Sequence, residues 1–224
     1  MSAPRFSPEA VLFDLDGTLL DTIADLAAAS NAMLAELGRP PRTQAEIHSF
    51  VGKGIGNLVW RCLSEGGPAA TPEETDAALQ VFRRCYAAVN GRATQPYPGV
   101  ADLLATLHAR DMKMAVVTNK ATAFTLPLLE QFGFARYFGA VVCGDTLPVR
   151  KPDPAAVEHA CAQLGVVPTR ALMVGDSAND AEAARAAGMP VLLVSYGYSE
   201  GAPVESIECD GLLSQIQEVM LRLD

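Results

Sequence analysis

The chain of 224 residues is half hydrophobic and 19% charged, and it carries a formal net charge of −9. This acidic balance argues against a nucleic-acid partner, because phosphate contacts need a basic surface. No apolar run approaches the roughly 20 residues that a bilayer-spanning helix needs, so we expect no membrane partner. The five cysteines form no CxxC pair, and the N-terminal residues lack a signal-peptide pattern, which together favour a reduced, cytoplasmic protein.

The first apolar run, AVLFDLD at residues 10–16, predicts a buried strand that ends in Asp14 and Asp16. No run typical of a strand follows between residues 21 and 96. Helical patterns occur there instead, at 22–37, 43–50, 55–64 and 73–90. We therefore expect an inserted α-helical cap over residues 21–96. The two prolines of QPYPGV (95–100) stiffen the hinge through which the chain returns.

After the hinge, four further apolar runs predict strands, and segments of helical period separate most of them. The strands are expected at residues 112–119, 139–145, 171–177 and 190–196, and the helices at 121–132, 154–164 and 179–187. Continuous apolar runs separated by helices are typical of a parallel sheet that is covered on both faces. The expected fold class is therefore α/β, with a doubly wound parallel sheet in a Rossmann-like core of residues 1–20 and 97–224.

Polar side chains stand where these predicted strands end. They are Asp14 and Asp16, Thr118 and Asn119, Asp145, and Asp176 with Asp180. In open parallel sheets, ligands bind outside the carboxyl ends of the strands, so these residues are expected to converge on one edge. Lys151 lies in the loop after the strand at 139–145, within reach of the same edge. The role of Asp145 stays open between this edge and an ordinary loop.

Gathered carboxylates are tolerated around a hard divalent cation, and Mg²⁺ takes one or two carboxylates together with phosphate oxygens. Mg²⁺ and Lys151 would form a local anion trap in an acidic protein, which suits phosphoryl transfer. Residues i and i+2 of an extended chain point to the same side. One aspartate of the Asp14–Asp16 pair can therefore attack phosphorus, while the other protonates the leaving oxygen and later deprotonates water.

Four segments resemble, in order, the four motifs of the haloacid dehalogenase-like hydrolases. They are DLDGT (14–18), VVTN (116–119), KPDP (151–154) and GDSAND (175–180). The helical segment after the first motif resembles the α-helical cap of that superfamily, so the match spans nearly the whole chain. Dehalogenases of the superfamily lack the second aspartate of the DxD pair, and its presence here implies phosphoryl chemistry.

The resemblance also implies catalytic and metal-binding roles. Asp14 would be the nucleophile and Asp16 the general acid/base. Mg²⁺ would be held by Asp14, the main-chain carbonyl of Asp16, and Asp176. Asp180 matches the second acidic position of the fourth motif, which supports the metal shell in relatives.

The same resemblance implies which residues bind the transferring phosphoryl group. Thr118 and Lys151 would hold it, and Lys151 would also restrain the nucleophile. Asn119, the last residue of VVTN, is expected to contact the substrate or the nucleophile loop.

Within the superfamily, the cap sequence FVGKGIGNLVWRCL (50–63), the segment TIADL (22–26) and the hinge most resemble bacterial phosphoglycolate phosphatases. This implies hydrolysis of 2-phosphoglycolate to glycolate and phosphate. The VGKGIG loop is either a flexible helix connector or a substrate loop of the cap. Our hypothesis is the second, with Gly52, Gly54 and Gly56 giving close approach and Lys53 or Arg61 meeting the substrate carboxylate.

Other functions stay open at this point. Relatives that act on sugar phosphates, amino-sugar 6-phosphates or pyrophosphate have similar cap sequences, and a β-phosphoglucomutase-like phosphotransferase would use the same core. A receiver domain, which is a switch and not an enzyme, also places Asp, Thr/Ser and Lys on such a sheet, but it lacks an acid/base two residues on and has no cap. The expected partner is a small phosphorylated metabolite, and the protein is a monomer or a homodimer.

Overall fold

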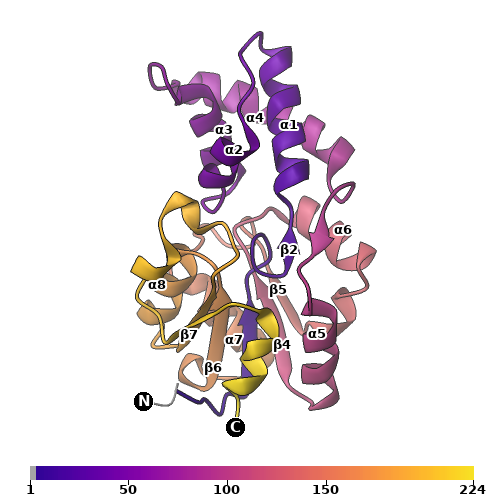
Figure 1. Cartoon of the computed structure of the whole chain (residues 1–224), viewed down its shortest axis with the longest axis vertical. Coiled ribbons are helices and arrows are strands. Elements are labelled where there is room, and N and C mark those ends of the chain that lie inside the picture. The colour runs from indigo at the N-terminus through magenta and orange to yellow at the C-terminus, as the bar shows by residue number, and fades with distance from the viewer. Residues whose placement is uncertain (1–3) are drawn as a thin grey trace.

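The computed structural model describes residues 4–224, in which a parallel sheet lies below a group of helices (Figure 1). Six strands form the sheet in the order β5-β4-β1-β6-β7-β8, and every neighbouring pair is parallel. The strands are β1 (Ala10–Phe13), β4 (Lys113–Val117), β5 (Ala140–Val142), β6 (Ala171–Gly175), β7 (Val191–Val194) and β8 (Gly211–Leu213). This topology confirms the predicted doubly wound α/β fold and places β1 in the interior of the sheet.

The side chains of β1 alternate between two hydrophobic clusters, as the two-residue period of a strand requires. Val11 and Phe13 belong to one cluster, whereas Ala10 and Leu12 belong to the other. The helices of the first cluster are α5 (Val100–Ala109) and α6 (Thr122–Gln131), and those of the second are α7 (Ala155–Leu164) and α8 (Ala178–Ala186). Both faces of the sheet are buried, which explains why its strands are continuously apolar in sequence.

Four helices, here called the cap helices, are inserted between β1 and the rest of the sheet. They are α1 (Ile23–Glu36), α2 (Gln44–Phe50), α3 (Ile55–Ser64) and α4 (Pro72–Val89). They lie beyond the carboxyl ends of the strands (Figure 1) and share a hydrophobic cluster of their own. Their ends agree with the predicted helices to within one residue. Capping boxes at Thr43 and Thr71 define the starts of α2 and α4.

The chain enters and leaves the cap helices at adjacent points. The short strand β2 (Leu20–Asp21) pairs antiparallel with β3 (Gln95–Pro96), so two residues at each end of the insert are strand where none was predicted. Beside this pair, the buried carboxylate of Asp25 accepts hydrogen bonds from the main-chain N–H groups of Gly91, Ala93 and Thr94 and from the Thr94 hydroxyl, at 2.7–3.0 Å. The first turn of α1 is thereby tied to the segment that follows α4.

Two further elements of the core were not predicted. Helix α5 follows the hinge directly, and β8 pairs with the edge of β7. Strand β8 offers only the two apolar side chains of Leu212 and Leu213 after Gly211, too few to stand out as an apolar run in the sequence. Within residues 4–224, no helix combines the length and the apolar character needed to cross a bilayer.

Candidate active site

The register of the sheet brings the predicted polar residues to one edge. Strand β1 pairs with β4 on one side and with β6 on the other, so residues that follow these three strands become neighbours. The pairing continues one residue past each strand, because the Asp14 N–H donates to the Val174 carbonyl at 3.0 Å and the Thr118 N–H donates to the Val142 carbonyl at 2.9 Å. The backbone of the sheet therefore fixes where these side chains begin.

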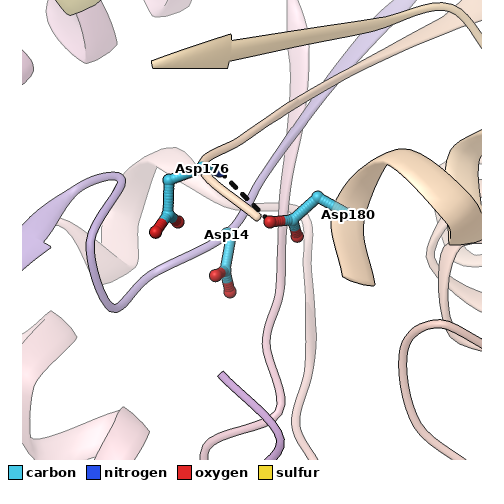
Figure 2. A group of neighbouring side chains, drawn as sticks. All are labelled: Asp14, Asp176 and Asp180. Atoms are coloured by element: carbon cyan, nitrogen blue, oxygen red, sulfur yellow. Dashed lines mark hydrogen bonds between the residues drawn. The ribbon is translucent and has the colours of Figure 1, made fainter. Parts of the chain in front are cut away.

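Three aspartates meet at this edge, from the end of β1, the end of β6 and the first turn of α8 (Figure 2). One carboxylate oxygen from each of Asp14, Asp176 and Asp180 lies within 4.8 Å of the other two. Asp176 and Asp180 are buried and the Asp14 side chain is only 13% exposed, so their mutual repulsion destabilises the folded state unless cations lie among them.

Lys151 is one such cation. Its Nζ lies 2.9 Å from Asp14 Oδ1 in an ion pair and donates a hydrogen bond of 2.6 Å to Asp180 Oδ1. Burial of the side chain lowers the pKa of Lys151, but the charges of Asp14 and Asp180 more than offset this and raise it above its ordinary value. The lysine is therefore a permanent positive charge beside Asp14.

The three carboxylates differ in how fully they are hydrogen-bonded. Asp180 Oδ2 accepts from the Asp176 N–H and from both the N–H and the hydroxyl of Ser177, and Lys151 occupies Oδ1. Asp176 accepts one hydrogen bond of 2.7 Å on each oxygen, from the Thr18 hydroxyl and the Tyr198 N–H. Asp14 Oδ1, in contrast, is buried and has only the Lys151 ammonium beside it, at 2.9 Å and without the alignment of a hydrogen bond. Among the three carboxylates, Asp14 is therefore the one least fully hydrogen-bonded.

The electrostatic consequence appears in the pKa values. Burial, opposed by Lys151 and reinforced by the charge of Asp180, raises the pKa of Asp14 to about 7. Burial together with the charges of Asp14 and Asp180 raises the pKa of Asp176 well above its usual range. Perturbed carboxylates that share one cleft are typical of functional sites.

The donor set fits a hard divalent cation. All available ligand atoms are oxygens, and Asp14 contributes a buried oxygen that lacks a hydrogen bond. Gly17 leaves room beside them, since a Cβ at that position would come within 2.4 Å of Asp176 Oδ2, and its φ of +90° suits glycine. Oxygen ligands with few carboxylates are the preference of Mg²⁺. The residues present therefore fit the expected cofactor.

A small cavity opens between this edge and the cap helices. On the core side it is lined by Asp14, Asp16, Thr118, Asn119 and Lys120. On the cap side it is lined by Leu26, Val51, Gly52, Gly54, Ile55 and Leu58. One wall is thus polar and charged, whereas the other is apolar apart from its main chain.

Asn119 connects the two walls. Its Nδ2 donates hydrogen bonds of 2.9 Å to the Gly52 carbonyl of the cap and to the Lys151 carbonyl of the core, while its buried Oδ1 has no hydrogen-bond partner. The VGKGIG loop approaches the core closely here, because a Cβ on Gly54 would come within 2.8 Å of the Arg150 guanidinium. This loop therefore lines the cavity, as our hypothesis for it required.

Two predicted substrate residues lie elsewhere. Neither Lys53 nor Arg61 is among the described residues that line the cavity. Lys53 Nζ forms an ion pair of 3.2 Å with Glu200, and the Arg61 guanidinium donates to the Ser49 carbonyl and stacks 4.2 Å above the Phe50 ring. Long side chains follow local partners that a sequence pattern does not specify, so their contact with substrate stays a prediction.

Asp145 does not join the cavity either. Its carboxylate accepts hydrogen bonds from the N–H and the hydroxyl of Thr122, at the start of α6. These bonds satisfy an N–H group that the first turn of a helix leaves free. Of the two roles left open for this residue, the loop role is the one that the structure supports.

Sequence reasoning missed Lys120, which is buried at the core wall. Its Nζ forms hydrogen bonds with both carboxylate oxygens of Asp16, at 3.0 and 3.2 Å, and donates to the Tyr86 hydroxyl of α4 at 2.6 Å. Burial lowers the pKa of Lys120, but Asp16 and Tyr86 raise it by more. The only signal available was its position directly after VVTN, which by itself does not distinguish it from a solvated lysine.

The parallel sheet, the cap helices inserted after β1 and the acidic edge define a capped Rossmann-like hydrolase. A family model described as "Haloacid dehalogenase-like hydrolase" matches residues 11–194. The chain belongs to this family.

Comparison with individual relatives indicates which kind of hydrolase the chain is similar to. The chain is 46% identical to a phosphoglycolate phosphatase of Nitrosospira multiformis, over 94% of this chain and 93% of that protein. A crystal structure of a predicted phosphoglycolate phosphatase from Haemophilus somnus is 30% identical, with a TM-score of 0.89 over 95% of this chain and 96% of the other. CbbY from Rhodobacter sphaeroides, solved as a mutant in complex with xylulose-1,5-bisphosphate, is 26% identical with a TM-score of 0.77, over 94% and 96%. The protein is a phosphoric monoester hydrolase, similar to phosphoglycolate phosphatases.

Proposed function

We propose that the protein hydrolyses 2-phosphoglycolate to glycolate and phosphate through an aspartyl-phosphate on Asp14, with Mg²⁺ as cofactor. The observation that carries the proposal is the arrangement of the DxD pair. Asp14 is paired with Lys151, Asp16 is held separately by Lys120, and both line one cavity. Two carboxylates in different surroundings can serve as nucleophile and as acid/base at the same phosphorus.

Mg²⁺ would be held by the carboxylates of Asp14 and Asp176 and by the main-chain carbonyl of Asp16. When bound, it supplies positive charge that offsets the three buried aspartates and the charge of the phosphoryl oxygens. Asp180 is assigned a supporting role, since its Oδ2 accepts three hydrogen bonds and Lys151 occupies its Oδ1, whereas each oxygen of Asp176 accepts only one hydrogen bond.

In the first step, an Asp14 carboxylate oxygen forms a bond to phosphorus, and the bond between phosphorus and the glycolate oxygen breaks. Protonated Asp16 gives its proton to that oxygen, so glycolate leaves as the alcohol. Lys151 and the Thr118 hydroxyl bind phosphoryl oxygens, with Lys151 also orienting Asp14. Proximity supports these assignments, since Thr118 and both aspartates line the cavity.

In the second step, water attacks the phosphorus of the aspartyl-phosphate. Asp16, now ionised, accepts the proton of that water, and the bond between phosphorus and the Asp14 oxygen breaks. Phosphate leaves, while Asp14 returns as a carboxylate and Asp16 returns protonated. The two steps consume one water and leave both aspartates unchanged.

The division of the chain proposed for this reaction is a catalytic core of residues 1–20 and 97–224 and a cap of residues 21–96. The cap closes the cavity and excludes bulk water during transfer. The hydrogen bond from Asn119 to the Gly52 carbonyl and the apolar cap wall both support closure over a small substrate.

The substrate assignment is supported by the relatives, since proteins that are 46% and 43% identical to this chain are phosphoglycolate phosphatases. A sugar bisphosphate is the second candidate, because CbbY of the same fold was solved with xylulose-1,5-bisphosphate.

The test is kcat/KM for phosphate release from 2-phosphoglycolate, xylulose-1,5-bisphosphate, hexose phosphates, an amino-sugar 6-phosphate and pyrophosphate, each with and without Mg²⁺. We expect 2-phosphoglycolate to exceed the others by at least ~10²-fold, about 3 kcal/mol of transition-state discrimination, and we expect activity to require Mg²⁺. A larger kcat/KM for xylulose-1,5-bisphosphate would overturn the assignment of 2-phosphoglycolate and identify the bisphosphate as the better substrate. Transfer of phosphate to a sugar hydroxyl without release would replace hydrolysis by phosphotransfer.

A further inference from the structure

Each aspartate of the DxD pair has its own buried lysine. Lys151 contacts Asp14 at 2.9 Å, and Lys120 contacts Asp16 at 3.0 Å. Both lysine side chains are only 2% exposed, but they come from different segments, Lys151 from the loop before α7 and Lys120 from the loop after β4. The first lysine faces the nucleophile and the phosphoryl site. The second has no part in the reaction as set out above.

The contacts of Lys120 use all three of its N–H donors. Two reach the carboxylate oxygens of Asp16, and the third reaches the Tyr86 hydroxyl at 2.6 Å. The ammonium also lies 4.8 Å from the centroid of the Tyr86 ring. A lysine whose donors are all engaged in a buried site has lost the rotamer freedom that a surface lysine keeps.

Tyr86 is itself rigidly placed. It is fully buried in α4, and its ring packs against Phe82 of the same helix and against Phe124 of the core, at centroid distances of 5.5 and 4.7 Å. It therefore holds the Lys120 ammonium from the cap side, while the backbone after β4 holds the residue from the core side. Tyr86 lies within one turn of the end of α4, near the point where Asp25 ties the first turn of α1 to the segment that follows α4.

Asp16 has one further hydrogen bond, which Thr22 donates to its Oδ1 at 2.7 Å. The Asp16 side chain stays 15% exposed and lines the cavity. Thr22 therefore fixes one oxygen, and Lys120 restrains the plane of the whole carboxyl group by reaching both oxygens. A general acid must present its proton to the leaving oxygen within a narrow range of geometry, which is what such a restraint supplies.

We propose that Lys120, supported by Tyr86, is a positioning residue that holds the carboxyl group of Asp16 in the orientation needed for proton transfer. The inference rests on the proposed function, in which Asp16 is the general acid/base. Lys120 keeps its proton throughout, and the proton that moves belongs to Asp16 in the first step and to water in the second.

The two half-reactions give this proposal a chemical signature. An alkoxide such as that of glycolate leaves poorly and needs the proton of Asp16, whereas 4-nitrophenolate leaves without one. Misplacing Asp16 should therefore slow aspartyl-phosphate formation from alkyl phosphates but spare its formation from 4-nitrophenyl phosphate. Attack by water needs Asp16 with either substrate, so the aryl substrate should give a rapid burst followed by slow turnover.

The experiment compares Lys120→Met, Tyr86→Phe and the wild-type enzyme in rapid-quench and steady-state assays with Mg²⁺. The substrates are 2-phosphoglycolate, ethyl phosphate and 4-nitrophenyl phosphate. Lys113→Met is the matched control, because Lys113 is an exposed core lysine that donates to the Leu164 carbonyl outside the site. Asp16→Asn is measured in parallel as the reference for loss of the acid/base.

For Lys120→Met we expect formation of the phosphoenzyme from both alkyl phosphates to fall by about 10²-fold or more. The 4-nitrophenol burst should stay within about threefold of wild type, at one equivalent per active site. Tyr86→Phe should show the same pattern at about tenfold or less, because it removes one hydroxyl, and it also tests the proposal if Lys120→Met does not fold. Lys113→Met should match wild type throughout.

An equal fall in the rate of phosphoenzyme formation from all three substrates would overturn the proposal in favour of a purely structural role. A higher KM confined to 2-phosphoglycolate, with unchanged kcat and unchanged rates on ethyl phosphate, would overturn it in favour of a contact with the substrate carboxylate. The Asp16→Asn variant distinguishes a failure of this inference from a failure of the proposed function. If Asp16→Asn lacks the leaving-group signature, the acid/base assignment itself fails. If Asp16→Asn has the signature and Lys120→Met lacks it, only the role of Lys120 fails.

Discussion

Two buried carboxylates, one at the base of the cap helices and one at the edge of the sheet, have opposite hydrogen-bonding surroundings. Asp25 in α1 is 2% exposed and accepts four hydrogen bonds from the chain that returns from α4. Asp14 after β1 faces two other aspartates, and its buried Oδ1 lies 2.9 Å from the Lys151 ammonium but accepts no aligned hydrogen bond. The residue type is the same and the Asp14 side chain is also largely buried, at 13% exposed, but the surroundings differ.

The contrast between Asp25 and Asp14 distinguishes a carboxylate that anchors the fold from one that is available for chemistry. A carboxylate whose oxygens are saturated by fixed N–H and O–H donors stabilises a fold and has nothing left to offer a ligand. A carboxylate that burial and like charges destabilise, and that lacks a hydrogen bond, persists where a ligand or a reaction uses it. Asp25 belongs to the first kind and Asp14 to the second, so substitutions should affect stability at one site and activity at the other.

The largest expected effect is on activity at Asp14. Asp14→Asn removes the nucleophile of the proposed mechanism, and kcat for phosphate release should fall by about 10⁴-fold or more. The free energy of unfolding in the absence of Mg²⁺ should stay the same or rise, because one of three repelling carboxylates is gone. Phosphate release and urea unfolding measure the two quantities. Substantial remaining turnover would contradict the covalent mechanism.

The next effect is on stability at Asp25. Asp25→Ala leaves four donors at the hinge without their acceptor, three of them in buried hydrogen bonds, and the free energy of unfolding should fall by about 3 kcal/mol. Urea unfolding checks this value against Ser7→Ala, which removes an exposed hydrogen bond to Asp224. The folded fraction should keep kcat within about tenfold of wild type, well short of the loss at Asp14. A neutral change in stability would show that water replaces the carboxylate.

A third effect links pH and Mg²⁺. Burial raises the pKa of Asp14 to about 7 in the folded state, against about 3.9 in an unfolded chain. Without a cation, this group therefore stabilises the protein most below pH ~4. This contribution to the free energy of unfolding decreases as the pH rises toward 7. Above pH ~7 the free energy of unfolding no longer changes with the ionisation of Asp14.

Mg²⁺ binds the ionised form and competes with this proton. Its affinity should therefore be weaker at pH 5 than at pH 8, by up to ~10²-fold for two pH units below the pKa. Thermal unfolding at several Mg²⁺ concentrations measures the affinity at each pH. In Asp14→Asn, the part of the pH dependence of Mg²⁺ affinity that comes from Asp14 should disappear. Equal stabilisation of the wild type at both pH values would count against Mg²⁺ binding at Asp14.

The smallest effects are expected in the cap loop. Lys53 is half exposed and paired with Glu200, and Arg61 is engaged by Ser49 and Phe50. On this geometry, Lys53→Ala should change KM for 2-phosphoglycolate by less than about threefold, because an exposed ion pair contributes little. Arg61→Ala should act on stability more than on KM. A marked rise in KM in either variant would instead favour the contact with the substrate carboxylate that the sequence pattern suggested.

How far the sequence predicts this protein depends on what positions each residue. Asp14, Thr118 and Asp176 follow buried strands, and the carboxyl ends of adjacent parallel strands must meet at one edge. Their convergence could therefore be predicted without coordinates. The cap helices were predictable as well, since their apolar period and their capping residues are local properties of the chain.

The partners of Lys120, Tyr86 and Asp25 were not predictable in this way. Lys120 contacts Asp16 across 104 positions and Tyr86 across 34, and Asp25 reaches Thr94 across 69. No periodic pattern specifies such pairs, because they depend on how the cap helices pack on the sheet edge. The same holds for the direction of the flexible Lys53 and Arg61 side chains.

The sheet, the inserted helices and the residues that gather at the edge thus follow from the amino-acid pattern alone, because backbone periodicity and strand direction are encoded locally. Tertiary packing, in contrast, sets which carboxylate is saturated, which is left without an aligned hydrogen bond and which lysine faces each aspartate of the DxD pair. Those properties depend on donors and charges brought together from distant segments, and their energies exist only once the cap helices and the core are packed against one another.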